Sequence, residues 1–187
     1  MWRWLAWRFD ARRLVFVDES GFTTSMTRLR ARAPRGLRAY GKVPRKWGKN
    51  QTLIASITLQ GAMCESLSIE GATDSLLFET YVEQLLAPKL CEGQVVVMDN
   101  LGAHRPKRIR ELIEARGAEL VFVPSYSPDL NPIEQAFSKI KSIVRKAGAR
   151  TRGALDEAIG EALSAVSPED AAGWFAHCGY RVQDQCL

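Results

Sequence analysis

Three short, continuous apolar runs restrict the folds open to this sequence more than any other feature. They lie at residues 14–18, 94–98 and 119–123, and polar or turn-forming residues follow each one. Runs of this length and composition are typical of strands buried on both faces of a sheet. A helix is predicted between the second and third runs, because Pro106 can open it and Gly117 can end it. Since strand–helix–strand units favour parallel pairing with right-handed crossovers, the three runs are predicted to form parallel strands of one sheet.

Two further strands are predicted early in the chain, at residues 52–59 and 64–69. The short connection between them suits an antiparallel hairpin, and residues 19–23 before them are predicted to be a turn. Further helices are predicted from apolar spacing and capping residues, with starts at Thr73 or Asp74, Pro132, Thr151 and Ser167. The predicted fold is of the α/β class, a five-stranded mixed sheet flanked by helices. The first strand lies between the hairpin and the fourth strand, at a topological switch point where such sheets form binding crevices.

The composition fits one packed domain. Of the 187 residues, 46% are apolar, yet no stretch approaches the ~18 consecutive apolar residues of a membrane span. The four cysteines form no CxxC pair, which favours reduced thiols in a cytoplasmic protein. We expect residues 1–13 to be an N-terminal extension that remains from a linker, residues 14–180 to be the domain, and residues 181–187 to be a tail.

The positive charge is concentrated in one segment. The chain has a net charge of +5, and residues 28–50 hold nine basic residues and no acidic one. A localised cationic strip favours a polyanionic partner, nucleic acid first, although charge alone fits a solvated flexible loop equally well. The glycines and prolines of the segment favour an extended loop or hairpin over a helix. The predicted DNA-binding residues are Arg28, Arg30, Arg32, Arg35, Arg38, Lys42, Arg45, Lys46 and Lys49.

Three carboxylates are the candidate catalytic residues. Asp18 and Asp99 each follow an apolar strand directly, and Glu134 lies on the first turn of the helix after the last strand. Carboxylates held together repel one another unless a cation lies between them, and oxygen ligands without Cys or His favour Mg²⁺ or Mn²⁺. Two such ions ~3.5–4 Å apart can support in-line displacement at phosphorus.

Each acid also has a structural alternative. Asp18 could pair with an arginine, and Asp99 could begin a turn. Glu134 has the strongest alternative, because Asn131 and Glu134 are spaced as the two members of a helix capping box.

The three acids lie within three longer motifs. Residues 14–21 read LVFVDESG, residues 97–104 read VMDNLGAH and residues 124–134 read PSYSPDLNPIE. Together these motifs resemble the DDE transposases of bacterial insertion sequences related to mariner. The 34 residues between Asp99 and Glu134 are similar to the spacing in that superfamily.

The resemblance covers residues 14–180 and implies an RNase H-like catalytic domain. It implies that Asp18, Asp99 and Glu134 are catalytic and bind the metal ions. A water would then cut a phosphodiester at the element end, and the freed 3′-hydroxyl would attack target DNA. Residues expected to orient the acids or contact the phosphate are Glu19, Asn100, His104 and Asn131. The implied partners are DNA, a second copy of the chain on that DNA, and an upstream helix-turn-helix protein from a split reading frame.

Two other functions fit the same sequence. A truncated, non-catalytic fragment could bind DNA through residues 28–50 and regulate a full-length transposase. A stand-alone nuclease of the same fold could cut branched DNA without a domain that reads sequence. The presence of all three acids favours an enzyme, whereas the short segment before the first strand favours the fragment.

Overall fold

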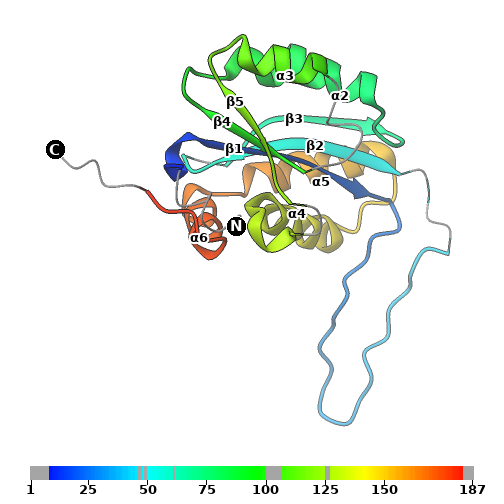
Figure 1. Cartoon of the computed structure of the whole chain (residues 1–187). Helices are drawn as coiled ribbons and strands as arrows, with labels where there is room; N and C mark the ends of the chain where they lie inside the picture. Colours follow the sequence, from blue (N-terminus) through cyan, green and yellow to red (C-terminus); the bar gives the residue numbers. More distant parts are fainter. Residues whose placement is uncertain are drawn as a thin grey trace.

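A central sheet of five strands organises the structure, which is a computed structural model that describes residues 9–45, 48, 50–60, 62–99, 107–124 and 127–182. The strands are β1 (Leu14–Phe22), β2 (Gln51–Thr58), β3 (Ala62–Glu70), β4 (Val95–Met98) and β5 (Glu119–Phe122). Their order is β3-β2-β1-β4-β5, with β1, β4 and β5 parallel and with antiparallel pairing from β1 to β2 and from β2 to β3 (Figure 1). The predicted mixed sheet, with its switch point at β1, is confirmed.

The prediction of a turn at residues 19–23 is wrong, because β1 continues to Phe22. Beyond Asp18 the strand stays paired with β2, and Glu19 lies opposite Ile54. Ser20 and Phe22 are buried on the same face of the sheet as the earlier even-numbered residues of β1. The alternation of a strand therefore continues through residues whose polarity resembles that of a turn.

Helices cover both faces of the sheet (Figure 1). One face carries α2 (Ser75–Tyr81), the π-helical turn η2 (Val82–Leu86), the 3₁₀ turn η3 (Ala87–Lys89) and α3 (Lys107–Glu114). The other carries α4 (Pro132–Ala147), α5 (Arg152–Ser164) and α6 (Pro168–His177). Two further 3₁₀ turns are η1 (Ala11–Arg13) and η5 (Pro128–Leu130). The predicted helix starts at Asp74, Pro132, Thr151 and Ser167 are confirmed within the usual boundary shifts.

The helix after Asp74 changes its winding before it ends. The Asp74 carboxylate accepts a hydrogen bond from the backbone N–H of Leu77 at 2.8 Å and so caps α2. The chain then widens into η2 and tightens into η3, which contains Pro88. A proline lacks the N–H for the helical ladder and its ring crowds the preceding turn, which explains why regular α-helix stops before it.

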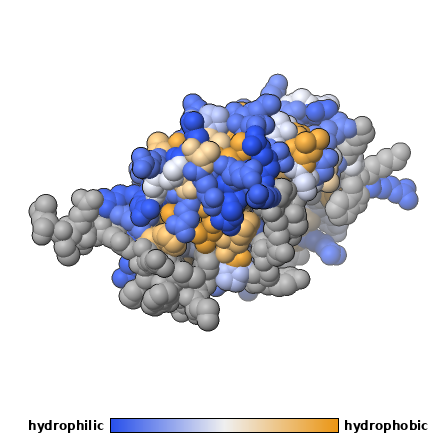
Figure 2. Space-filling view, turned by 45° about the horizontal axis from the view of Figure 1, so that its top comes forward, coloured by the Kyte–Doolittle hydropathy of each residue, from blue (hydrophilic) through white to orange (hydrophobic). Residues whose placement is uncertain are grey.

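The sheet divides the core into two apolar layers. Leu14 and Phe16 of β1 pack with the α4–α6 side, whereas Val15 and Val17 pack with the α2/α3 side. Figure 2 turns the α2/α3 side toward the viewer and shows a largely hydrophilic surface with smaller apolar patches. Within the described residues, no helix has both the length and the apolar composition to cross a membrane.

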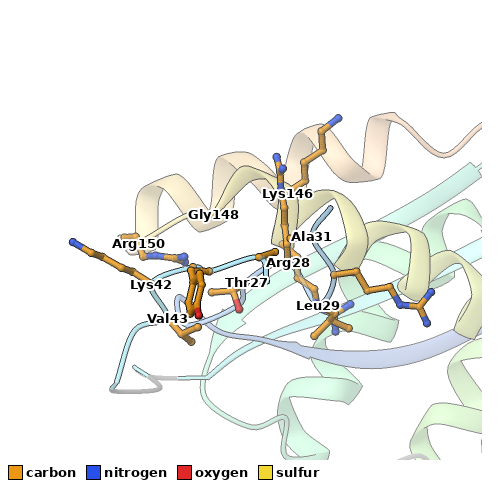
Figure 3. A pocket seen from close by; sticks show the side chains of 14 residues that line it. Thr27, Arg28, Leu29, Ala31, Lys42, Val43, Lys146, Gly148 and Arg150 are labelled. Carbon is orange, nitrogen blue, oxygen red and sulfur yellow. The ribbon is translucent and has the colours of Figure 1, made fainter. Parts of the chain in front are cut away.

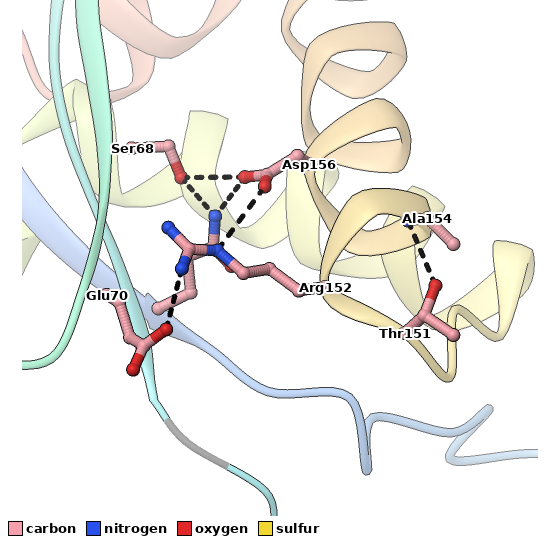
Figure 4. Close-up of polar contacts among 7 residues, drawn as sticks. Ser68, Glu70, Thr151, Arg152, Ala154 and Asp156 are labelled. Atoms are coloured by element: carbon pink, nitrogen blue, oxygen red, sulfur yellow. Dashed lines mark hydrogen bonds and ion pairs between the residues drawn. The ribbon is translucent and has the colours of Figure 1, made fainter.

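A polar network fixes α5 against the edge of the hairpin (Figure 4). Arg152 Nη1 donates to Glu70 Oε2 at 2.7 Å, and Gln51 Nε2 donates to both Ser68 Oγ and Asp156. Thr151 caps the helix through the N–H of Ala154 at 3.3 Å. Gln51 is buried, so its amide gains partners that it would otherwise lack away from water.

The basic segment forms a long arm between β1 and β2. We define the arm as residues 23–45, which contain no helix or strand and project from the end of β1 away from the sheet (Figure 1). The predicted extended loop is confirmed for these residues. Most of the arm is exposed, including Leu29, Leu37 and Tyr40.

Candidate active site

Asp18 and Asp99 lie on neighbouring parallel strands at the same level. Val17 pairs with Met98 in the β1–β4 register, so the next residue along each segment is one of the two acids, Asp18 within β1 and Asp99 just after β4. Alternation along the strands puts both acids on the face that α4 covers. Asp18 is buried, and Asp99 is half-buried. The predicted approach of these two acids at the switch point is thus reproduced by the sheet register.

Asn131 links the start of α4 to Asp18. Its Nδ2 donates a hydrogen bond of 2.9 Å to Asp18 Oδ2, and both residues are buried. The second carboxylate oxygen, Asp18 Oδ1, accepts the backbone N–H of Glu19 at 2.7 Å. Hydrogen bonds to both oxygens fix the orientation of the carboxylate. The interaction of Glu19 with Asp18 is made by its main chain, and strand alternation points its side chain toward the opposite face.

The capping-box alternative for Glu134 is wrong. Asn131 is the N-cap residue of α4 and Pro132 follows it, as predicted, but the Asn131 side chain makes no capping hydrogen bond. Its amide is directed to Asp18 instead. The Glu134 side chain is exposed on the first turn of the helix, one turn beyond Asn131.

One buried acceptor beside Asp18 has no partner among the described residues. It is Asn131 Oδ1, and a buried polar atom left without a partner is costly in a folded protein. An ordered water or a hydrated cation beside the Asp18 carboxylate would provide the missing donor. The oxygen-only chemistry of Asp18, Asp99, Asn131 and Glu134 fits Mg²⁺ or Mn²⁺.

The structure brings the two aspartates together but does not complete a cluster of three. Across the described part of the chain, no three Asp, Glu, His or Cys side chains gather closely enough to hold one ion. Glu134 lies one helical turn after Asn131, and Asn131 contacts Asp18. Glu134 is thus on the part of α4 nearest the aspartates. Two other predicted site residues, Asn100 and His104, lie outside the described residues.

Tyr180 supports the loop that carries Asn131, and sequence reasoning missed it. Its hydroxyl donates a hydrogen bond of 2.7 Å to the carbonyl of Leu130. Its ring lies 5.0 Å from that of Phe16 and 6.1 Å from that of Phe175. The turn just before Asn131 is therefore tied to the core by a buried aromatic cluster. An isolated Tyr far along the chain gives no signal of such a contact.

Cys178 is the one described cysteine near this end of α4, and its thiol is not poised for nucleophilic chemistry. Burial, with a smaller contribution from the negative charge of Asp129, raises the pKa of Cys178 to about 11. Gln135 Nε2 lies 3.7 Å from its sulfur. Since the thiolate is the reactive form, a thiol with a raised pKa is inert near neutral pH.

The predicted DNA-binding residues divide into described and undescribed groups. Arg28, Arg30, Arg32, Arg35, Arg38, Lys42 and Arg45 are exposed on the arm, whereas Lys46 and Lys49 lie outside the described residues. Sequence reasoning missed Arg150, which holds the root of the arm. Its Nη1 donates to the carbonyls of Thr24 at 2.9 Å and Met26 at 3.0 Å. This contact crosses more than a hundred residues, so no local pattern could have indicated it.

Known proteins similar to this chain are endonucleases or transposases. Residues 13–156 match the family described as DDE superfamily endonuclease. The transposable element Tcb2 transposase of Caenorhabditis briggsae is 31% identical over 140 residues, which are 70% of this chain and 51% of that protein. The chain thus spans about half the length of this curated relative.

Solved structures with a similar fold include two of Mos1. A pre-cleavage Mos1 transpososome has a TM-score of 0.72 at 17% identity, over 96% of this chain and 60% of that chain. The catalytic domain of Mos1 mariner transposase has a TM-score of 0.68 at 15% identity, over 93% of this chain and 82% of that chain. At these identities the likeness establishes the fold, and it confirms the RNase H-like architecture.

Proposed function

This chain belongs to the DDE superfamily endonucleases, and from that premise we propose that it is the catalytic domain of a transposase. In this proposal it cuts a DNA strand with the help of divalent metal ions and joins the freed end to target DNA. Tcb2 and Mos1 are described as transposases, which supports transposition over other uses of the same chemistry.

One observation carries the proposal. The last pair of the β1–β4 register, Val17 with Met98, sets Asp18 and Asp99 side by side at the carboxyl end of β4, with Asp18 inside the longer strand β1. Asn131 hydrogen-bonds to Asp18 from the start of the helix that bears Glu134. Carboxylates at that edge of an open α/β sheet lie where such folds bind ligands.

Asp18, Asp99 and Glu134 are the residues that would hold Mg²⁺ or Mn²⁺, two ions in this proposal. Bound there, the metal would supply Lewis-acid activation of the phosphodiester and of the attacking oxygen. The unpartnered Asn131 Oδ1 would accept a hydrogen bond from water at the same place. The hydrogen bonds from Asn131 and from the main chain of Glu19 hold the Asp18 carboxylate in a fixed orientation.

The proposed reaction is two displacements at phosphorus. In the first, a water molecule loses a proton and its oxygen forms a bond to phosphorus while the bond between phosphorus and the 3′-oxygen breaks. The 3′-oxygen takes up a proton and leaves as the free 3′-hydroxyl, and the phosphate stays on the 5′ end of the other fragment. In the second, that 3′-hydroxyl loses its proton and attacks a phosphodiester of target DNA, which releases a target 3′-oxygen. Neither step needs a covalent bond to the protein, consistent with the inert Cys178 thiol.

The finer parts of the proposal concern context. We propose DNA as the partner of the arm, through its exposed arginines and Lys42. The bacterial insertion-sequence origin, action as a homodimer on DNA and cooperation with a separate helix-turn-helix protein are proposed from the resemblance of the three motifs. The cytoplasmic location is proposed from the cysteine pattern. Asn100 and His104 stay proposed contacts of the acids or the phosphate.

Cleavage of a labelled DNA duplex in Mn²⁺ tests the proposed activity. The wild-type chain should nick the duplex, and Glu134→Gln should lower the rate by at least ~10³-fold, because loss of several kcal/mol of transition-state stabilisation is expected when a metal-binding carboxylate is removed. Glu161→Gln, the same change at an exposed position of α5, is the matched control and should cut at the wild-type rate.

Other outcomes identify the alternatives. DNA binding without cleavage by the wild-type chain would contradict the enzyme and support the regulatory fragment. Preferential cutting of branched over linear element-end DNA, without strand joining, would support the stand-alone nuclease. Equal rates for Glu134→Gln and wild type would remove Glu134 from the proposed site.

A further inference from the structure

A cationic groove lies between the arm and the C-terminal end of α4 (Figure 3). It consists of two adjoining hollows of about 560 and 850 Å³ that share Arg28, Arg30, Arg145 and Lys146 in their walls. No aspartate or glutamate is among the described residues that line either hollow. The basic side chains around the groove are Arg28, Arg30, Lys42, Arg145, Lys146 and Arg150.

The groove differs in this respect from the basic surface of α3. There each of the three cations has an acidic neighbour, and the pairs are Lys107 with Glu111 at 3.4 Å, Arg108 with Glu83 at 3.0 Å and Arg110 with Glu114 at 3.0 Å. None of the six groove cations has an ion pair with an acid in the described part of the chain, and Arg150 donates only to main-chain carbonyls. Gathering like charges without counter-charge is unfavourable, so the groove is arranged for an external anion.

Stabilisation of α4 explains only part of this charge. Cations in the last turn of a helix interact favourably with its dipole, worth ~0.3–1 kcal/mol each. This interaction with the dipole explains Arg145 and Lys146, which lie in the last turn of α4. It gives no reason for Arg28, Arg30 and Lys42 of the arm to face the same space.

One row of exposed side chains connects the groove with the proposed catalytic acid. The exposed residues of α4 before its final residue are Glu134, Ser138, Ser142 and Lys146. They are spaced four apart, so they form a continuous row along one side of the helix. The two serines are small hydroxyl donors, which leave room for a chain to lie against the helix and can bond to phosphate oxygens.

The helix runs along β1 toward the arm. Asn131 contacts Asp18 at its start, Lys141 Nζ lies 5.8 Å from the centre of the Phe22 ring further along, and Arg150 holds the arm root beyond its end. The row therefore begins one helical turn after the residue that contacts Asp18 and ends in the groove.

We propose that this row and the groove form the bed for one DNA backbone, which extends from the cleaved bond toward the arm. Ser138 and Ser142 donate to its phosphates, and Arg145 and Lys146 on α4 face Arg28 and Arg30 of the arm across it. Guanidinium groups suit this role because they bind phosphate oxygens in pairs. The proposal rests on the proposed function and assigns residues of α4 to it that the sequence did not indicate.

The length of the row determines how many nucleotides separate the groove from the cleaved bond. Twelve residues from Glu134 to Lys146 rise ~18 Å along a helix. Successive phosphates of one strand of duplex DNA rise ~3.4 Å along the duplex axis, so for a duplex aligned with α4 the groove would hold the backbone about five nucleotides from the cleaved bond. A single small anion would not need a bed of this length.

Salt-dependent binding of a fluorescent 40-base-pair duplex, measured by anisotropy in EDTA, tests the bed without requiring cleavage. Arg145→Gln/Lys146→Gln should weaken binding and make the slope of log K against log salt shallower by ~1.8, since each lost phosphate contact removes ~0.9. The matched control is Lys89→Gln/Arg116→Gln, the same charge loss at two exposed positions at the amino ends of the strands. Its slope should equal that of wild type.

A substitution in the middle of the row keeps the test independent of those two cations. Ser142→Glu should weaken binding much more than Ser142→Gln, because the two side chains differ by one negative charge against the backbone. Circular dichroism and melting temperature identify any variant that has lost its fold.

The outcomes separate this proposal from the proposed function. Wild-type slopes in Arg145→Gln/Lys146→Gln, together with equal binding by the two Ser142 variants, would overturn the bed while metal-dependent cleavage by the wild-type chain still supported the nuclease. Failure of wild type to bind the duplex would overturn both. Unchanged DNA binding with loss of self-association, measured by sedimentation, would assign the groove to an acidic surface of a protein instead.

Discussion

The two ends of helix α4 differ in burial, charge and partners. At its start, Asn131 is buried and hydrogen-bonded to Asp18, and the loop before it is tied to the core through Tyr180. At its end, Arg145 and Lys146 line an open groove, and Gly148 closes the helix with a φ of 65°. Both ends pack on the core, the second through Val144, but only the first end has buried polar side-chain contacts, whereas the cations of the second face an open groove.

The difference suggests a division of labour along one helix. Reacting groups need positions fixed within fractions of an ångström, which packed elements provide. A backbone-binding surface tolerates long, adaptable side chains because its affinity is largely electrostatic. The charges at both ends, acidic at the start and basic at the end, also suit the helix dipole, so one arrangement stabilises the helix and serves both roles.

The prediction with the largest expected effect is that the metal binds only at the acids near the start of α4 and not in the groove at its end. Mg²⁺ or Mn²⁺ should raise the melting temperature of the wild-type chain, because a ligand that binds only the folded state stabilises it. Asp99→Ala should abolish that rise, whereas Arg145→Gln/Lys146→Gln should keep it. Differential scanning fluorimetry with and without metal measures both.

Either of two results would contradict the proposal that the two ends of α4 have separate roles. A metal-induced rise that survives Asp99→Ala would place the ion elsewhere. A rise that disappears in the groove variant would show that the two ends are coupled and not separate.

The second prediction concerns the attachment of the arm. Arg150→Ala removes the hydrogen bonds to the carbonyls of Thr24 and Met26. Chymotrypsin cleavage in the arm, which offers the exposed Leu37 and Tyr40, should become about tenfold faster, since the lost contacts are worth about 1.4 kcal/mol. Mass spectrometry of timed digests gives the rates.

Arg152→Ala is the control for this experiment. Arg152 is also exposed and lies two residues further on, but its partners are Glu70 and Asp156 and not the arm. Arm cleavage in Arg152→Ala should stay at the wild-type rate. Equal acceleration in both variants would mean that local unfolding of α5, and not the root contact, controls the arm.

The third prediction concerns the turn that ends α4. Gly148 has a φ of 65°, and an alanine there would be strained although a Cβ meets only Arg150 Nη2 at 3.9 Å. Gly148→Ala should lower the free energy of unfolding by about 1 kcal/mol. Gly153→Ala, in the first turn of α5 with open space around it, should be neutral or stabilising by up to about 1 kcal/mol. Urea denaturation compares the two, and equal effects would contradict a conformational cause.

The sequence predicted most of the sheet because its strands are governed by local patterns. Apolar runs indicated β4 and β5, and the connections between strands left few topologies for β1. The extension of β1 to Phe22 was missed, since Glu19-Ser20-Gly21 has the composition of a turn and is kept extended by pairing with β2.

The candidate site was predicted only in part for a similar reason. Asp18 and Asp99 come directly after the apolar residues of β1 and β4, so the sheet topology alone brings them together. The contacts of Asn131 and Tyr180 join segments far apart in the chain, and a capping pattern at Asn131 pointed to a different partner. The groove is lined by residues of both the arm and α4. The exposed row of α4 could therefore not be recognised as part of a binding surface before the arm was placed beside it.

The prediction with the smallest expected effect concerns the packing around Cys178, near the start of α4. Burial raises the pKa of Cys178 to about 11, while the hydrogen bond from Gln135 on α4 lowers it. Iodoacetamide at pH 8 should therefore label Cys178 much more slowly than the exposed Cys91. Because the folded thiol has the higher pKa, its contribution to stability is complete below pH 9 and is lost as the pH rises toward 11.

Gln135→Leu sharpens this last prediction. Without the donor, the thiolate of Cys178 loses a stabilising contact, so its pKa should rise further and labelling should slow by a few-fold. Peptide mass mapping follows Cys178 and uses Cys91 as the internal reference. Faster labelling in Gln135→Leu would mean that Gln135 acts chiefly by covering the sulfur, and that the start of α4 opens to solvent more readily than its contacts with Asp18 and the core imply.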